Sequence, residues 1–229
     1  GKLGERLSTQ LEPDSLALEV AFTNTPFLQE NGFTEETILA LFIPNTYEFY
    51  WNTPANKIAN KLAKEYKKFW NEDRLAKAKA KNLTPIQVYT LASIVHKETA
   101  KVDERPDVAG VYLNRLRQDM PLQADPTIIY AIKLRSGDFD QEIKRVFYND
   151  LRIKSPYNTY INKGLPPGPI AMPDVSAIDA VLNATNHDYI YFCANPDKPG
   201  YHAFASSYEA HQVNAKKYGE WVTKLGIDR

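Results

Sequence analysis

A single glutamate, Glu98, stands where its side chain could act as a general acid. Leu91 and Ile94 precede it at helical spacing, so Glu98 continues an apolar stripe that is expected to face the interior. Burial raises the pKa of a carboxyl group, and the negative end of a helix dipole does the same. A glutamate that keeps its proton near neutral pH can donate it to a leaving oxygen. The competing interpretation is a buried glutamate that Arg105 or Arg115 keeps ionised.

Other catalytic centres that a sequence can reveal are missing from this chain. The four histidines, at positions 96, 187, 202 and 211, form no His-Glu-x-x-His pair, so no metal site is predicted. The sequence has no Gly-x-Ser-x-Gly segment around a nucleophilic serine, no Gly-Lys-Ser/Thr phosphate loop and no dinucleotide fingerprint. The expected chemistry therefore uses no cofactor and depends on Glu98.

A protonated glutamate suits the cleavage of a glycosidic bond. A glycosidase with two carboxylates would need a second acid, for which Asp103, Glu104 and Asp125 are available. One acid is enough if a hydroxyl group of the substrate itself attacks the anomeric carbon. Glu98 would then protonate the leaving oxygen and accept the proton of the attacking hydroxyl, without water and without a protein nucleophile.

The helix that carries Glu98 has a well-defined predicted start. Thr84 supplies an N-cap hydroxyl, Pro85 fits the first helical position, and Gln87 completes a capping box. A second helix is predicted after a short link, which makes the two helices antiparallel neighbours. Asn114 on the second helix is therefore expected near Glu98.

Polar and aromatic residues outside these helices complete the predicted site. Gln123 and Asp125 end a short extended piece, and Asp125 also fits the N-cap of the next helix. The loop that follows that helix is stiffened by prolines, which fix side chains at low entropic cost. Its candidate ligands are Tyr157, Asn158 and Tyr160. Further candidates for stacking on sugar rings are Tyr47 and Trp51.

The C-terminal part of the chain predicts the only β-structure. Residues 189–194 and 201–205 are two apolar, aromatic runs around a Pro/Gly turn, which is typical of a β-hairpin. The last helix places His211 on its apolar face, where a histidine is either a satisfied core residue or a ligand. The predicted fold class is α+β, mostly helical, with a small sheet or hairpin.

Composition narrows the possible partners. The chain has 229 residues, a formal net charge of zero and a pI near 7.1, so nucleic acid is not an expected partner. A single cysteine, Cys193, excludes a disulfide within the chain. No apolar run approaches the ~20 residues of a membrane span.

Several motifs, in order along the chain, resemble one bacterial family. They are Ile43-Pro44-Asn45-Thr46-Tyr47, Lys97-Glu98-Thr99, Asn114-Arg115-Leu116, Leu122-Gln123-Ala124-Asp125-Pro126-Thr127, Ser155-Pro156-Tyr157-Asn158-Thr159-Tyr160 and Gly164-Leu165-Pro166-Pro167-Gly168-Pro169-Ile170. Residues 43–218 are similar in this way to the MltG, or YceG-like, endolytic murein transglycosylases, formerly labelled aminodeoxychorismate lyases. Two positions depart from the family pattern. His96, on the predicted solvent-facing side of its helix, replaces a glutamate, and Asp174 replaces a glycine.

The resemblance implies an activity and a location. Such an enzyme cleaves the MurNAc-GlcNAc β-1,4 bond within nascent peptidoglycan, leaves 1,6-anhydroMurNAc ends and terminates strand elongation. It implies that Glu98 is the catalytic residue, in a domain on the periplasmic side of the inner membrane, with cell-wall synthases as partners. Residues 1–42 would be a helical segment leading from a LysM-like region and membrane anchor absent from this sequence, and residues 43–229 the catalytic domain.

Two rival interpretations remain open at this point. A hydrolytic muramidase would use the same Glu98 together with water, and a non-catalytic scaffold would bind peptidoglycan without cleaving it. In the enzymatic interpretations Glu98 is the general acid and base. The predicted substrate-binding residues are Asn114, Gln123, Asp125, Tyr157, Asn158, Tyr160 and His211.

Overall fold

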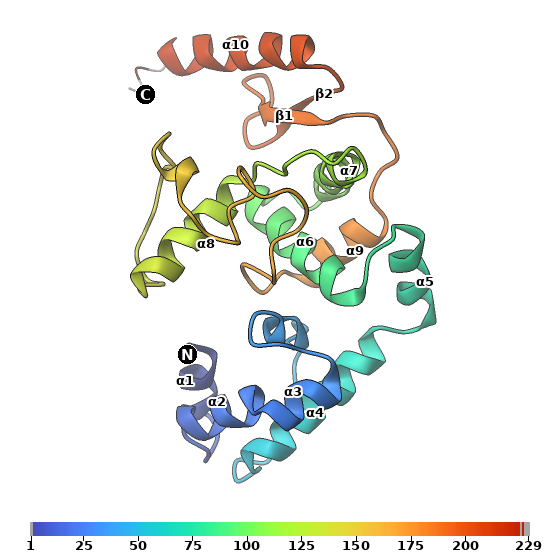
Figure 1. The fold of residues 1–229 in the computed structure, drawn as a ribbon, viewed down its shortest axis with the longest axis vertical. Coiled ribbons are helices and arrows are strands. Elements are labelled where there is room, and N and C mark those ends of the chain that lie inside the picture. Colours follow the sequence, from blue (N-terminus) through green and yellow to red (C-terminus); the bar gives the residue numbers. More distant parts are fainter. Residues whose placement is uncertain (1, 225, 227–229) are drawn as a thin grey trace.

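The computed structural model describes residues 2–224 and 226, and it arranges them in three groups along one long axis (Figure 1). The N-terminal group holds α1 (Lys2–Ser8), α2 (Ser15–Thr23), α3 (Thr25–Asn31), the 3₁₀ helix η1 (Ile38–Leu41) and α4 (Ala55–Phe69). The middle group holds α5 (Glu72–Ala80), α6 (Pro85–Glu98), α7 (Arg105–Arg117), α8 (Asp125–Ser136), the 3₁₀ helix η2 (Asp150–Arg152) and α9 (Val175–Leu182). The third group holds β1 (Tyr191–Ala194), β2 (His202–Ala205) and α10 (Tyr208–Lys224).

Helix α6 lies at the centre of the middle group and ends at Glu98 (Figure 1). Its start is as predicted, because the Thr84 and Gln87 side chains each accept a hydrogen bond from the other's backbone N–H, at 3.3 and 2.9 Å. Every residue from Val88 to Val95 is buried, since α5, α7, α8 and α9 all pack against α6. The catalytic candidate is thus carried by a helix that neighbouring helices enclose.

This enclosure corrects the expectation that His96 faces solvent. His96 is half-buried, with its Nδ1 3.3 Å from Asp174 Oδ2 and 3.4 Å from Arg105 Nη2. The sequence shows one apolar stripe on this helix, but α9 covers a second face that the stripe does not predict. Of the two residues that precede Glu98, His96 and Lys97, only Lys97 is exposed.

Helix α7 packs against α6 but does not run antiparallel to it. Figure 1 views α7 nearly along its axis while α6 runs across the view, so the two helices cross. The link between them contains a turn before Arg105, which redirects the chain. The crossing decides which side of α7 faces the end of α6.

The predicted hairpin is confirmed, although its strands are shorter than expected. β1 and β2 pair antiparallel with Tyr191 opposite Ala205 and Ala194 opposite His202. Helix α10 lies across them at one end of the molecule (Figure 1). The mostly helical α+β class with one small sheet is confirmed for the described part of the chain.

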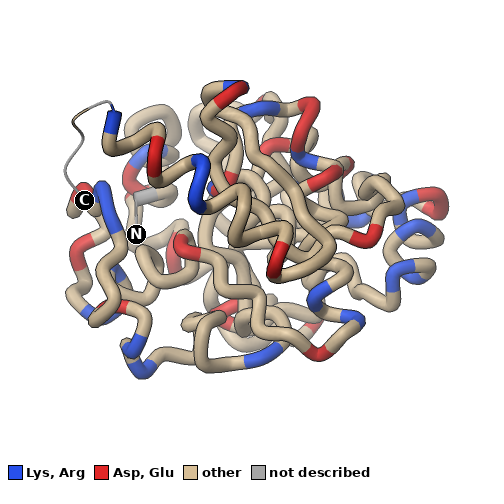
Figure 2. The backbone as a smooth tube through the Cα atoms, turned by 90° about the horizontal axis from the view of Figure 1, so that it is seen from above, with Lys and Arg blue, Asp and Glu red and all other residues tan. Residues whose placement is uncertain are grey.

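The outer surface carries charges of both signs. Figure 2 shows basic and acidic residues interspersed along the backbone, in line with the zero net charge. Among the described residues, no helix combines the length and the apolar content needed to cross a bilayer. Helix α4 packs on α2 and therefore lies with the N-terminal group, and the division of the chain at residue 42 stays a prediction.

Candidate active site

Glu98 is the last residue of α6, and its side chain is half-buried. Its Oε1 accepts a hydrogen bond of 2.6 Å from the hydroxyl of Tyr112, a buried residue of α7. The pKa of Glu98 is raised from 4.5 to about 7, and burial is the largest cause. The hydrogen bond from Tyr112 opposes this shift, and the negative charge of Asp125 adds to it. Near neutral pH the carboxyl group is therefore poised between its acidic and its basic form.

Neither arginine that might have kept Glu98 ionised is paired with it. Arg105 donates to Asp174 Oδ2 at 3.3 Å and to Ser176 Oγ at 2.7 Å. No ion pair among the described residues includes Glu98. The interpretation of Glu98 as half of a structural ion pair is therefore wrong.

Arg115 instead holds together the backbone segments around the glutamate. It donates to the carbonyl oxygens of Ile190, Pro121 and Leu122 at 2.7, 3.1 and 3.0 Å, and to Gln123 Oε1 at 3.1 Å. Its guanidinium group also lies over the ring of Tyr191 in β1, 5.4 Å from the ring centre. One buried cation thus fixes α7, the turn before α8 and the first strand relative to each other.

The backbone of Gln123 has an unfavourable conformation that surrounding contacts must hold in place. Its φ is +53°, in the left-handed region that non-glycine residues avoid. A backbone hydrogen bond to the Thr159 carbonyl, at 3.0 Å, and the side-chain contact with Arg115 hold it there. Such strain is often found at ligand-binding positions, and the exposed Gln123 side chain lies on the rim of this cluster.

Asp125 is not the N-cap that the sequence allowed. Ala124 occupies the cap position of α8, and Asp125 is the first helical residue, without a capping hydrogen bond. Its Oδ1 instead accepts a hydrogen bond of 2.5 Å from the Tyr160 hydroxyl. Burial, Asp125 and then the charge of Glu98 raise the pKa of Tyr160, so these two side chains belong to the surroundings of Glu98.

Three predicted ligands have their polar groups occupied elsewhere. Asn114 donates from its amide to the carbonyl oxygens of His187 and Tyr189, both at 2.8 Å, because the crossing of α7 turns it away from the end of α6. Asn158 is fully buried and donates to two carbonyl oxygens of the segment around η2. Tyr157 is buried with its ring centre 4.7 Å from that of Tyr130. The structure gives these residues contacts that shape loops.

His211 reaches the site from the last helix. Its ring stacks on Tyr191 at 5.1 Å between ring centres, with an angle of 17° between the planes. Its Nδ1 is buried without a hydrogen-bond partner among the described residues. Burial and the nearby charge of Arg115 lower the pKa of His211, so the ring is neutral near neutral pH. It therefore offers an unused polar atom beside Arg115.

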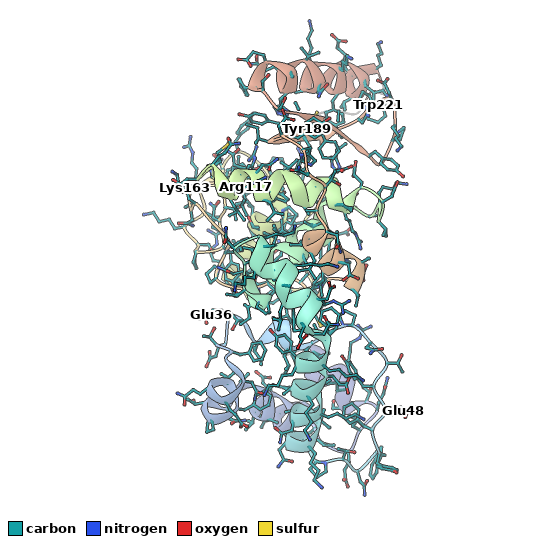
Figure 3. The ribbon with its side chains drawn as sticks, turned by 90° about the vertical axis from the view of Figure 1, so that its right-hand side faces the viewer. Glu36, Glu48, Arg117, Lys163, Tyr189 and Trp221 are labelled. Atoms are coloured by element: carbon teal, nitrogen blue, oxygen red, sulfur yellow. The ribbon has the colours of Figure 1, made fainter. Side chains whose placement is uncertain are left out.

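The other acids and aromatic residues considered from the sequence lie elsewhere. Asp103 accepts from the Tyr201 hydroxyl, and Glu104 accepts from both the backbone N–H and, at 2.9 Å, the ring of His202, so both acids anchor the hairpin. Tyr47 and Trp51 flank Glu48, which lies at the end of the molecule opposite the hairpin (Figure 3). The described residues contain no cluster of three or more His, Cys, Asp or Glu suited to a metal ion.

Sequence reasoning missed the hydrogen-bond partner of Glu98. Tyr112 falls on the apolar stripe of its helix, where its hydroxyl group signals a need for a buried polar partner. Arg115 was considered only as a counter-ion, and Tyr191 only as part of a strand. A search for polar atoms on the apolar stripes of neighbouring helices would have paired Tyr112 with Glu98.

The raised pKa of Glu98 gives a prediction for folding stability. Between pH 4.5 and about pH 7, Glu98 keeps a proton in the native state that it has released in the unfolded state. The free energy of unfolding therefore falls as the pH rises through this window. Glu98→Gln has no such titration. Relative to the wild type, the variant should gain roughly 3 kcal/mol between about pH 4 and pH 8. Urea unfolding at both pH values measures this gain, and a constant difference would contradict the raised pKa.

Comparison with known proteins identifies the family. The sequence model of the YceG-like family matches residues 2–217. A protein named endolytic murein transglycosylase from Streptococcus pneumoniae serotype 2 (strain D39 / NCTC 7466) is 41% identical over 142 residues, which are 61% of this chain and 25% of that protein. Another of that name, from Bacillus subtilis (strain 168), is 34% identical over 177 residues, 76% of this chain and 46% of that protein.

A solved structure shares the arrangement of helices described above. The crystal structure of a yceG-like protein from Listeria monocytogenes matches with a TM-score of 0.75 at 28% identity, covering 93% of this chain and 71% of that one. The chain spans less than half the length of the two curated relatives. From the family match and the shared fold, the chain belongs to the YceG-like family.

Proposed function

We propose that this chain is the catalytic part of an endolytic murein transglycosylase, with Glu98 as its general acid and base. The observation that carries the proposal is the carboxyl group at the end of α6, which has a pKa of about 7 and accepts a hydrogen bond from Tyr112, and which has no cationic partner within the described part of the chain. The names of the relatives from S. pneumoniae and B. subtilis support the substrate class.

The proposed reaction needs one carboxyl group and no water. Protonated Glu98 gives its proton to the glycosidic oxygen while the bond from that oxygen to C1 of MurNAc breaks. The C6 hydroxyl of the same MurNAc attacks C1, and its proton passes to Glu98. The products are a 1,6-anhydroMurNAc end and a free 4-hydroxyl on GlcNAc, and Glu98 returns to its protonated state.

Tyr112 acts on this cycle as a positioning residue. Its hydroxyl group binds Oε1 at 2.6 Å, which fixes the carboxyl plane and leaves Oε2 for proton transfer. Because this hydrogen bond lowers the pKa of Glu98, Tyr112→Phe should raise it. We expect the basic limb of the pH–rate profile of strand cleavage to move to higher pH. An unshifted limb with a lower rate would assign Tyr112 a packing role only.

Removing the charge of Asp125 should shift the basic limb of the pH–rate profile in the opposite direction. Its negative charge raises the pKa of Glu98, so Asp125→Asn should move the basic limb to lower pH while the product keeps its anhydro end. In the muramidase alternative Asp125 would be the second carboxylate, and its loss would stop the reaction. Mass spectrometry of the products separates the two mechanisms, because hydrolysis adds one water to the new end and transglycosylation adds none.

Of the predicted substrate-binding residues, Asp125 and Tyr160 interact electrostatically with Glu98, while Gln123 and His211 are near Arg115. Gln123 and Asp125 are exposed, while His211 is half-buried. Their polar groups suit the hydroxyl and N-acetyl groups of a glycan. Asn114, Tyr157 and Asn158 would contribute by holding the surrounding loops.

The wider setting of the reaction is part of the proposal. A substrate in the cell wall requires a catalytic domain outside the cytoplasm, and the family resemblance adds a membrane anchor and neighbouring cell-wall synthases. Digestion of purified peptidoglycan tests the activity directly. New 1,6-anhydroMurNAc ends within strands support the proposal, while binding without new ends would favour the scaffold alternative.

A further inference from the structure

A cavity lies against the face of α7 that carries Gly110, Leu113 and Arg117. It has a volume of about 760 Å³, and its walls come from the end of α5, the first half of α6, α7, and the loop at residues 164–167. None of Glu98, Tyr112, Gln123, Asp125 or Tyr160 lines it. A volume of this size is typical of a small-ligand site.

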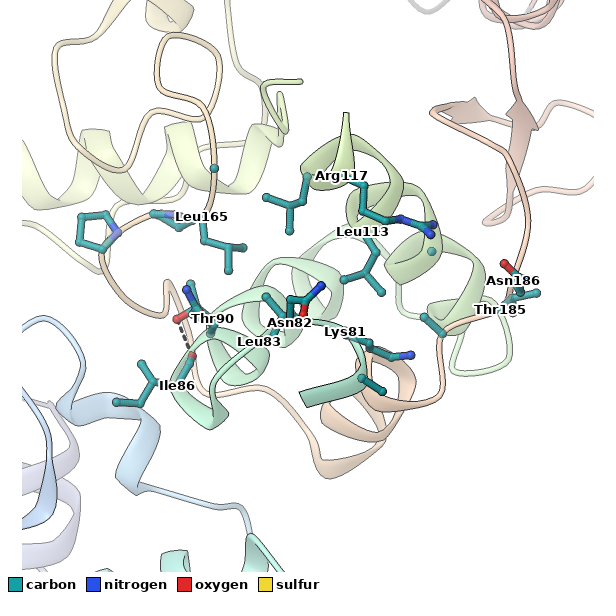
Figure 4. A pocket seen from close by; sticks show the side chains of 18 residues that line it. Lys81, Asn82, Leu83, Ile86, Thr90, Leu113, Arg117, Leu165, Thr185 and Asn186 are labelled. Atoms are coloured by element: carbon teal, nitrogen blue, oxygen red, sulfur yellow. Dashed lines mark hydrogen bonds between the residues drawn. The ribbon is translucent and has the colours of Figure 1, made fainter. Parts of the chain in front are cut away.

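The cavity has an apolar side and a cationic side. The close view places Leu165 and Ile86 on one side, and Lys81 and Arg117 toward Thr185 on the other (Figure 4). Figure 3 shows Arg117 beside Lys163, below Tyr189 and the last helix. Leu83, Leu113 and Leu116 extend the apolar wall.

The positive charge of this cavity is not neutralised by the protein. Among the described residues, no aspartate or glutamate lines it, and neither Lys81 nor Arg117 forms an ion pair. Burial and then the charge of Arg117 lower the pKa of Lys81, so the two cations lie close enough to repel each other. A bound anion would relieve that repulsion.

Besides the two cations, the cavity is lined by the neutral polar side chains of Asn82, Thr90, Gln87, Thr185 and Asn186. The Thr90 hydroxyl donates to the Ile86 carbonyl at 2.8 Å, as the dashed line in Figure 4 shows, and the Gln87 side chain is held in the capping box. Arg117 uses one N–H for Asn114 Oδ1 and keeps others free. The ligand that fits carries a carboxylate at one end and small apolar groups at the other.

We propose that this cavity binds the carboxylate-bearing stem peptide of a murein strand whose sugar backbone lies at Glu98. The inference rests on the proposed function. The stem peptide branches from the MurNAc unit and carries free carboxylates and alanine methyl groups, which match the two sides of the cavity.

The position of the cavity agrees with such a branched substrate. The loop that brings Tyr160 to Asp125 continues into Leu165, and α7 presents Tyr112 to one site and Leu113 to the other. Thr90 and Glu98 are eight residues apart on α6, which is about 12 Å along a helix axis.

Titration with a synthetic stem tetrapeptide that carries no sugar tests the inference without turnover. Calorimetry with the full chain should show binding, and Lys81→Gln should weaken it by about tenfold through the lost charged contact. Arg117→Gln should weaken it similarly. Lys79→Gln is the matched control, because Lys79 is exposed in the last turn of α5, two residues before Lys81, and does not line the cavity. A tetrapeptide with amidated carboxylates should bind the wild type as weakly as the unmodified tetrapeptide binds Lys81→Gln.

Three results would overturn the inference. They are no binding of the tetrapeptide to the wild type, equal binding by Lys81→Gln and Lys79→Gln, and full displacement of the peptide by equimolar inorganic phosphate. A folding check by circular dichroism accompanies each variant, so that a lost site is not confused with a lost fold.

A cleavage assay separates this inference from the proposed function. Lys81→Gln should slow cleavage of peptide-bearing strands and leave cleavage of strands stripped of peptide unchanged. Peptide binding without any strand cleavage would reject the proposed function and keep the cavity assignment. Cleavage of both substrates at wild-type rates by Lys81→Gln would reject the cavity assignment and keep the function.

Discussion

Glu98→Gln is expected to lower the rate of strand cleavage by about 10³-fold or more, because the amide cannot deliver a proton to the glycosidic oxygen. The substitution keeps the size and shape of the side chain, and Gln Oε1 can still accept the Tyr112 hydrogen bond that Glu98 accepts. The measurement is the yield of 1,6-anhydroMurNAc ends from purified peptidoglycan, quantified by mass spectrometry against time.

Two controls make this result specific. Glu72→Gln makes the same chemical change at an exposed position in the first turn of α5 and should retain full activity. Sedimentation with insoluble peptidoglycan should show that Glu98→Gln still binds the polymer. Unchanged cleavage by Glu98→Gln would remove the central claim of the proposed function and favour a scaffold.

Arg115→Met should cause the largest loss of folding stability, about 3 kcal/mol or more. The substitution leaves three carbonyl oxygens and the Gln123 side chain without the donor they share, in a place where water does not readily replace it. Urea unfolding followed by tryptophan fluorescence measures the change. Activity should fall as well, because Gln123 loses one of the contacts that hold its strained backbone.

Two further variants show whether charge or geometry is responsible. Arg115→Lys keeps the positive charge but cannot reach all four acceptors, so its stability should lie between those of the wild type and Arg115→Met. Arg135→Met removes an exposed arginine from the last turn of α8 and should change stability by less than about 0.5 kcal/mol. Equal losses for Arg115→Met and Arg135→Met would contradict the role assigned to Arg115.

The parts of the fold that the sequence predicted are those set by local chemistry. The capping box of Thr84 and Gln87, the inward position of Glu98 and the hairpin all depend on residues close together in the chain, and all three are confirmed. The motifs quoted for the family resemblance also led to the family that the comparison identifies.

The parts that it did not predict depend on tertiary contacts. Because α7 crosses α6 instead of running beside it, Tyr112 and not Asn114 contacts Glu98. The left-handed backbone of Gln123 has no local cause, since Gln is not a residue that favours it. Arg115 joins carbonyl groups that are up to 75 residues away in the sequence, and no local sequence pattern predicts such contacts.

The complete burial of α6 between Val88 and Val95 has a mechanical consequence for the acid that it carries. A rod enclosed on all sides cannot bend or slide without moving its neighbours, so thermal displacement of Glu98 is limited to that of the whole central packing unit. Adjustments to a long and irregular polymer then fall to the rim, where the exposed Gln123 and the last helix lie. The proton donor stays still while its surroundings adapt.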